Sequence, residues 1–303
     1  MEDVRNRVYA VREITLAQTR TGGSYLRLAL WDGCERVEGR VWDSATAESL
    51  AGQVKAGDVL VVVEARWAQF AGEKQLNIAA ARPAQPGEYD PMQLRPKKEG
   101  IPAVSDLVAL MDTVRRQHLR SLLDAVFTAD LLREIEAAPA AKGMHHNYAG
   151  GLLEHTLEVV RLCDAACGVY GKLDRDLLVT GAALHDVGKL QEYDSSSITF
   201  ERTDPGRLLG HVVMGWDLVR RAWVSIPGFP EQEGLHLEHL VLSHHGQREW
   251  GSPTEPCTPE AVALHHADLT SARINQALEA VSGVACGWTP KDVSGRSFWV
   301  PVS

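Results

Sequence analysis

Histidine and aspartate residues recur through the second half of the chain at intervals that suit one shared metal site. Eleven of the twelve histidines lie between His145 and His266. The candidate metal ligands are His155, His185, Asp186, His211, His244, His245 and Asp268. Imidazole and carboxylate groups together bind divalent ions such as manganese, iron, cobalt and zinc. With the adjacent pairs His185-Asp186 and His244-His245 each taken as one position, successive candidates lie 23 to 33 residues apart, about the length of one helical hairpin, so returning helices could gather them around one centre.

The His185-Asp186 pair follows an apolar stretch that predicts a buried helix over residues 177–184. A glycine turn and Lys189 come directly after it. Each histidine taken singly is more typical of a helix end or of a hydrogen-bonded core residue. An aspartate and several imidazoles buried together without partners would cost several kcal/mol, on the order of 2–7 for each polar group. A bound metal removes that cost, so the series as a whole favours a metal site.

The candidates outnumber the ligands of a single ion. His155, His185, Asp186 and Asp268 would complete one site, and His211, His244 and His245 indicate a second ion that shares Asp186. Two ions roughly 3.5–4 Å apart stabilise the attacking and leaving oxygens of phosphoryl transfer. Lys189 then becomes a cation for a phosphate oxygen. Asp186 and Lys189 are therefore the candidate catalytic residues.

The first 82 residues have the alternating pattern of short β-strands. A long strand through residues 8–11, a strand over 25–31, an Asp32-Gly33 hairpin and a strand over 36–42 come first. A short helix near residues 45–51 precedes two more strands over 59–63 and 75–79. Five strands with one helix after the third predict an OB-fold barrel.

The rest of the chain is predicted to be helical. Residues 83–101 hold four prolines and two glycines and are predicted to form an extended linker. From Ser105 onward, apolar residues recur at helical spacing until about Ser282. The predicted architecture is multidomain α and β, with a five-stranded OB-fold barrel over 1–82, a linker over 83–101, an all-α domain over 102–286 and a tail over 287–303.

Charge and cysteine content limit the expected partners and the expected cellular compartment. The net charge is −9, yet residues 1–87 hold 11 Lys/Arg and 11 Asp/Glu, so the excess acidity lies in the helical part. Because contacts with phosphates dominate nucleic-acid affinity, an acidic chain argues against tight nucleic-acid binding. The five cysteines form no CxxC pair, which favours a reduced, cytoplasmic setting. No signal peptide or membrane-length apolar run is visible, so no membrane partner is expected.

Several motifs together resemble the HD-domain metal-dependent phosphohydrolases. They occupy residues 139–156, 181–189, 206–211, 242–246 and 263–268. The closer resemblance is to YhaM-type 3′-to-5′ exoribonucleases, which join an N-terminal OB-fold to an HD domain. This resemblance implies release of nucleoside monophosphates from single-stranded RNA, with single-stranded DNA as a further substrate. It also implies two divalent ions, manganese first and cobalt, iron, magnesium or zinc as alternatives, and leaves a homo-oligomer open.

The resemblance and the barrel each suggest substrate contacts. Lys142, His145 and His146 lie in the motif before the first ligand helix and would contact the substrate. OB-folds stack bases on aromatic side chains over a positive groove. Tyr25 and Phe70 are the candidates chosen from a larger aromatic set, although aromatic residues in a small barrel more often belong to its core. The remaining members are Trp31, Trp42 and Trp67.

Three other functions use the same residues differently. A phosphohydrolase acting on nucleotides or cyclic nucleotides would leave the barrel without a clear task. A di-iron HD oxygenase has a similar ligand set, but Lys189 beside the His-Asp pair argues mildly against it. A non-catalytic RNA-binding protein would not need a complete ligand set.

Overall fold

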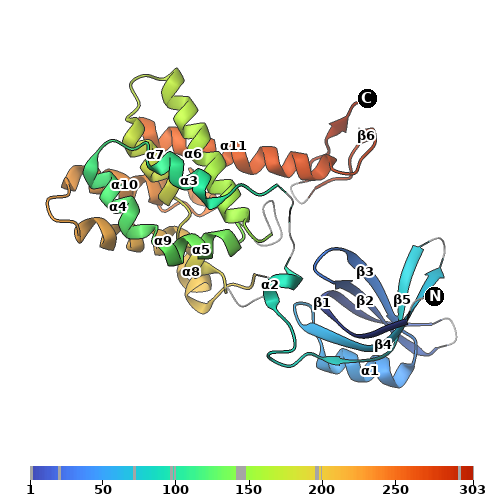
Figure 1. Ribbon diagram of the computed structural model, residues 1–303. Coiled ribbons are helices and arrows are strands. Elements are labelled where there is room, and N and C mark those ends of the chain that lie inside the picture. The colour runs from blue at the N-terminus through green and yellow to red at the C-terminus, as the bar shows by residue number, and fades with distance from the viewer. Residues whose placement is uncertain are drawn as a thin grey trace. The chain divides into compact units, whose positions relative to one another are not determined.

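The computed structural model of the chain forms two compact units (Figure 1). The first unit comprises Met1–Lys97 with Ser196–Thr199, and the second comprises Lys98–Ser195 with Phe200–Ser303. The structure describes residues 3–19, 22–70, 73–95, 98, 100–140, 148–194, 198, 200–292 and 295–302. The side chains of Phe70, Glu73 and Met92 are outside this description. The predicted substrate residues Lys142, His145 and His146 also lie outside the described residues.

The first unit is the predicted five-stranded barrel. Its elements are β1 (Asp3–Gln18), β2 (Ser24–Trp31), β3 (Arg36–Val41), α1 (Ser44–Gln53), β4 (Val59–Phe70) and β5 (Glu73–Pro83). The strands close in the order β1-β2-β3-β5-β4. All neighbours are antiparallel except β3 and β5, which are parallel. The helix after the third strand and the closed barrel confirm the OB-fold prediction.

Alternation of buried and exposed residues explains the barrel wall. On β3, Val37, Gly39 and Val41 are buried, whereas the intervening charged residues reach outward. A Cβ at Gly39 would lie only 3.1–3.3 Å from Ile78, Leu30 and Leu28, so the interior has no space for a larger residue. The β4 and β5 strands extend beyond the predicted ranges because they pair with each other as far as Phe70 and Glu73.

Helix α1 closes one end of the barrel, and a further segment packs on its outside. The Asp43 side chain accepts a hydrogen bond from Thr46 N and thereby caps α1. Within the predicted linker, α2 (Pro91–Leu94) forms part of the same unit. Its Leu94 is buried in a cluster with Ala10 and Val59.

The second unit is helical, as predicted. Its helices are α3 (Val104–Met111), α4 (Gln117–Val126), α5 (Ala129–Ala137), α6 (Gly151–Val169), α7 (Arg175–Leu184), α8 (Lys189–Glu192), α9 (Asp204–Val224), α10 (Glu231–Ser243), η1 (Arg248–Trp250) and α11 (Pro259–Val281). A short hairpin of β6 (Gly287–Trp288) and β7 (Trp299–Val300) follows. Within the described residues, no helix is both long and apolar enough to cross a membrane.

Helix α7 is the centre of this unit. Every residue from Leu177 to Leu184 is buried, as expected for a helix that is apolar on all sides. It packs against α6, α10 and α11 around one apolar core (Figure 1). The helix ends at Leu184, directly before His185, so the core itself fixes the position of the His-Asp pair.

Two glycines shape the approach of α8 and α9 to that point. A Cβ at Gly188 would lie 2.1 Å from His211 O and 2.5 Å from Gly215 N, so only glycine permits this close backbone contact. Gly210 has φ 74° and interrupts α9 with a kink directly before His211. The left-handed backbone at Gly210 is accessible to glycine at little cost. The kink therefore begins a new helical turn at His211.

Candidate metal centre

Seven predicted ligand residues lie together in the helical unit, although they come from five helices. His155 is on α6, His185-Asp186 follows α7, His211 follows the kink in α9, His244-His245 follows α10 and Asp268 is on α11. Two groups have mutually close donor atoms, within 4.8 Å of one another: His155 with His185 and Asp186, and His211 with His244 and His245. Asp268 joins the first group, because its Oδ1 lies 3.1 Å from His155 Nε2.

The two carboxylate oxygens of Asp186 face different histidine groups. Oδ2 lies 3.4 Å from His155 Nε2 and 3.3 Å from His185 Nε2. Oδ1 lies 3.5 Å from His211 Nε2 and 3.6 Å from His244 Nε2. Asp186 is only 2% exposed, so this carboxylate is held between the groups and away from bulk water. Each of its oxygens therefore faces the imidazole nitrogens of a different group.

Hydrogen bonds at the other ring nitrogen define the tautomer of each histidine. The Nδ1 atoms of His185, His244 and His245 lie 2.7–2.9 Å from the backbone carbonyls of Ala182, Val241 and Trp250. A carbonyl can only accept, so each Nδ1 carries the proton and donates it. His211 Nδ1 likewise faces a carboxylate oxygen of Glu192 at 2.9 Å. When such a ring is neutral, its Nε2 lone pair is therefore directed at the centre.

His155 reaches the same tautomer through a serine. Its Nδ1 lies 2.9 Å from Ser271 Oγ, and the single hydroxyl proton of Ser271 is donated to Glu158 Oε2 at 2.7 Å. Ser271 Oγ must therefore accept from His155 Nδ1. In the neutral form of each ring, all five Nε2 atoms can therefore present lone pairs to the two groups.

Converging lone pairs fit a cation. His155 and His185 approach through Nε2 atoms at 3.3 Å, and His211 and His245 approach through Nε2 atoms at 3.2 Å. When both rings of a pair are neutral with the proton on Nδ1, the two facing Nε2 atoms cannot hydrogen-bond to each other. Among the described residues, Asp186 Oδ1 and His244 Nε2 are buried atoms that find no hydrogen-bond partner. Buried polar atoms of this kind call for a ligand, and the histidine and carboxylate donors suit a divalent metal.

The electrostatic environment favours ionised carboxylates and mostly neutral imidazoles. Burial alone raises the pKa of Asp186, but Lys189, His185 and hydrogen bonds from the histidines outweigh it and lower the pKa well below its usual range. Asp268 behaves similarly, because its hydrogen bond with His155 outweighs burial and lowers its pKa. Burial lowers the pKa of His244 and His245. These protonation states are the ones that metal ligands require.

His155 shows how strongly the first group attracts positive charge. Burial lowers its pKa, yet hydrogen bonds to Asp186 and Asp268 outweigh that effect and raise it to about 9. The position between its Nε2 and the two carboxylates therefore favours a cation, whether a proton or a metal ion.

Lys189 is directed at the shared carboxylate. Its Nζ donates to Asp186 Oδ2 at 2.5 Å, and its side chain is 13% exposed. Burial lowers the pKa of Lys189, but the charge of Asp186 outweighs burial and raises it, so the amine stays cationic. An ammonium with two further N–H donors beside Asp186 suits an anionic substrate group.

The interpretation of the sequence missed four residues that support the predicted ligands. Glu192 and Ser271 hydrogen-bond directly to His211 and His155, and Glu158 and Asn275 connect to His155 through Ser271. Helical spacing could have indicated two of these residues. Glu158 lies three residues after His155, and Ser271 lies three residues after Asp268, so each shares a helix face with a ligand. Glu192 offered no comparable signal, because its contact with His211 depends on how α8 and α9 pack.

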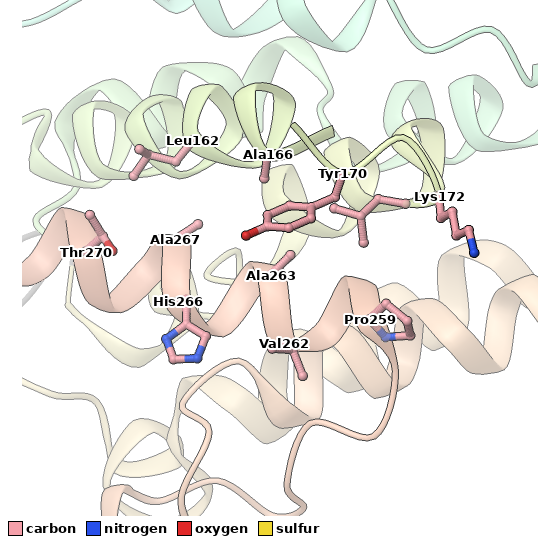
Figure 2. A pocket seen from close by; sticks show the side chains of 11 residues that line it. Leu162, Ala166, Tyr170, Lys172, Pro259, Val262, Ala263, His266, Ala267 and Thr270 are labelled. Carbon is pink, nitrogen blue, oxygen red and sulfur yellow. The ribbon is translucent and has the colours of Figure 1, made fainter. Parts of the chain in front are cut away.

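A separate apolar groove of about 790 Å³ lies between α6 and α11 (Figure 2). Tyr170 and Val262 contribute to its walls, and its lining contains no carboxylate. His266 lines this groove, whereas His265 Nδ1 lies 2.8 Å from His244 O. Neither histidine belongs to the two ligand groups.

The barrel carries an aromatic surface of its own. Tyr25 stacks on Trp42 with ring centroids 4.9 Å apart and an interplanar angle of 18°. Trp42 is 50% exposed and its Nε1 donates to Asn77 Oδ1 at 3.0 Å. Trp42, Trp67 and Asn77 line a hollow of about 620 Å³. Phe70 ends β4, and its side chain is outside the described part of the chain.

Fold and site together define an HD-type metal-binding domain joined to an OB-fold barrel. The family model described as HD domain matches residues 152–273. Three similar proteins, each named 3′-5′ exoribonuclease YhaM, come from Bacillus licheniformis, Oceanobacillus iheyensis and Shouchella clausii. They are 30%, 31% and 32% identical to this chain, over 96%, 96% and 91% of it and 93%, 92% and 87% of their own lengths. The chain belongs to the YhaM family.

Proposed function

We propose that this protein is a metal-dependent 3′-to-5′ exoribonuclease that releases nucleoside monophosphates from single-stranded RNA. The observation that carries the proposal is the position of Asp186, whose two oxygens face two separate histidine groups. Membership of a family whose relatives are named 3′-5′ exoribonucleases supports the reaction and the substrate. Single-stranded DNA is a second substrate to compare in the same assays.

His155, His185, Asp186 and Asp268 would hold one divalent ion. His211, His244 and His245 would hold the second, with Asp186 shared. Such ions activate a water molecule and stabilise charge on the attacking and leaving oxygens of a phosphodiester. Histidine with carboxylate suits manganese, which we expect first, and cobalt, iron, magnesium and zinc are the alternatives.

The protein's own residues would perform the remaining tasks. Asp186 fixes the spacing of the two ligand groups, since both of its oxygens are engaged. Lys189, held by Asp186, would donate hydrogen bonds to a phosphate oxygen and stabilise the charge that develops there. The buried helix ends around the site limit bulk water near these groups.

The barrel would bind the RNA strand upstream of the scissile bond. Exposed aromatic rings accept stacked bases, and nearby cations attract the backbone. The Tyr25–Trp42 stack supplies the rings. Lys74 lies 4.1 Å from the ring centroid of Trp67, and Arg66 lines the same hollow. Tyr25, predicted from the sequence, would therefore act together with Trp42.

A gel assay tests the whole proposal. Metal-free protein is incubated with a 5′-labelled single-stranded RNA while manganese, cobalt, magnesium, iron or zinc is restored singly. We expect a ladder that shortens from the 3′ end with manganese and no cleavage without metal. RNA that stays intact with every metal, while a small phosphodiester is hydrolysed, would contradict the exoribonuclease and support a nucleotide phosphohydrolase.

Replacing Trp42 with Ala should weaken RNA binding without affecting the metal centre. Loss of one stacking partner costs about 1–3 kcal/mol per base, or roughly 5- to 150-fold in Kd. The measurement is the Kd for a labelled RNA by fluorescence anisotropy, with turnover of a small phosphodiester as the internal reference. Tyr170→Ala is the control, because Tyr170 is an exposed aromatic residue of the helical unit. Equal RNA affinity in Trp42→Ala and the unmodified protein would contradict the assignment.

A further inference from the structure

The two ligand groups differ in their own negative charge. The first contains two carboxylates, Asp186 and Asp268, with two histidines. The second contains three histidines and, among the described side chains, has only the shared oxygen of Asp186 as a carboxylate donor. The second group is therefore the poorer site for a divalent cation, unless a carboxylate hydrogen-bonded to one of its histidines supplies further negative charge.

Glu192 supplies such a charge. Its Oε2 lies 2.9 Å from His211 Nδ1, and the residue is only 2% exposed. A carboxylate that accepts from the far nitrogen of an imidazole fixes the ring orientation and makes the near nitrogen a stronger ligand. The other histidines of this group, His244 and His245, have backbone carbonyls in that position. Glu192 is thus the one carboxylate seen behind the second group within the described residues.

The packing of α8 against α9 holds Glu192 in place. Its Oε1 lies 3.2 Å from Arg202 Nε, and its backbone carbonyl accepts from Thr203 N at 2.9 Å. A Cβ at Gly206 would lie 2.4 Å from Glu192 O, so the helix start fits only because that residue is glycine. These contacts hold the backbone of Glu192 against α9, which itself carries His211.

Glu158 has the equivalent place behind the first group. It accepts from Ser271 Oγ at 2.7 Å and from Asn275 Nδ2 at 2.7 Å. Ser271 in turn accepts from His155 Nδ1, as argued above. Each ligand group therefore has one histidine whose hydrogen bonds end on a carboxylate, directly in one case and through a serine in the other.

We propose that Glu192 and Glu158 are positioning residues that each support a different ion: Glu192 acts through His211 on the second ion, and Glu158 acts through Ser271 and His155 on the first. The proposal rests on the two-ion site described under the proposed function. It assigns separate tasks to residues that touch neither substrate nor ion. Their removal should consequently affect the two ions one at a time.

Manganese titration of the metal-free full-length protein tests this directly, with free Mn²⁺ counted from its electron paramagnetic resonance signal. The unmodified protein should bind two ions per chain. Glu192→Gln should weaken one binding step by about 10- to 100-fold and leave the other unchanged. Ser271→Ala should weaken the other step. Glu201→Gln is the control, because it makes the same charge change at a partly exposed residue whose carboxylate lies 3.8 Å from Arg207.

Double variants assign the steps. Asp268→Asn removes a carboxylate of the first group, so adding Glu192→Gln should weaken both steps, whereas adding Ser271→Ala should leave the second step intact. If Glu192→Gln does not unfold cooperatively, Glu192→Asp carries the test. Its carboxylate lies one methylene further from His211, so it should selectively weaken the same step.

Two results would overturn the assignment of Glu192. One is an unchanged titration of its variants, and the other is equal weakening of both steps, which would indicate a general structural role. An unmodified protein that binds only one ion would overturn the two-ion site and this proposal with it. Two ions in the unmodified protein, with no selectivity in the variants, would overturn the positioning roles alone.

Discussion

Replacing Asp186 with Ala should lower kcat/KM for RNA by at least about a thousandfold. Its two oxygens face His155 with His185 on one side and His211 with His244 on the other. The variant loses the carboxylate whose oxygens face both groups, so both ions should bind more weakly. Loss of about 4 kcal/mol of transition-state stabilisation, within the several kcal/mol that metal ions supply, corresponds to this factor.

The measurements for Asp186→Ala are cleavage of a labelled RNA and binding of the same RNA. Binding should survive, because Tyr25 and Trp42 belong to the barrel unit. Asp217→Ala is the matched control, since Asp217 pairs with Arg221 at the surface of α9. Cleavage at more than a few per cent of the original rate, with manganese present, would refute the role of Asp186.

Replacing Lys189 with Met should lower kcat by about 100- to 1,000-fold, the effect of removing one preorganised donor from a developing charge. Metal content should stay at that of the unmodified protein. The amine competes with a cation for Asp186 Oδ2, so its loss does not remove a ligand. The two variants therefore separate catalysis from metal binding: Asp186→Ala loses both, and Lys189→Met loses only the first.

Steady-state rates and metal analysis of the desalted protein check the Lys189 prediction. Lys172→Met is the control, because Lys172 lines the apolar groove between α6 and α11 (Figure 2). A drop in activity that follows a matching drop in bound metal would show that Lys189 supports the ions instead. An unchanged kcat would exclude Lys189 from the reaction.

Much of the fold could be predicted because it depends on local patterns. The alternation on β3 and the apolar run of α7 follow from residue type at neighbouring positions. The strands predicted for β4 and β5 were too short, because cross-strand pairing extends them to Phe70 and Glu73. The helix α2 inside the predicted linker was missed for a similar reason. Its Leu94 is buried by Ala10 and Val59, which lie far from it in the sequence.

The sequence alone determined which metal-binding residue types are present, in what order and at what spacing. The spacing of histidines and aspartates, His185-Asp186 at the end of an apolar helix and the glycine before Lys189 were sufficient to predict a metal centre. These are properties of single segments. Helical periodicity and metal-donor chemistry depend on residue type and local spacing, so they can be recognised from the sequence alone.

Only the tertiary structure decided how the two ligand groups are divided and supported. Which oxygen of Asp186 faces which histidines depends on the meeting of separate helices. His155 and Ser271 are 116 residues apart, and Glu192 meets His211 only because α8 packs against a kinked α9. Likewise, Tyr25 of β2 and Trp42, which directly follows β3, form one stacked surface. Such contacts are set by close packing between elements, which no local pattern specifies.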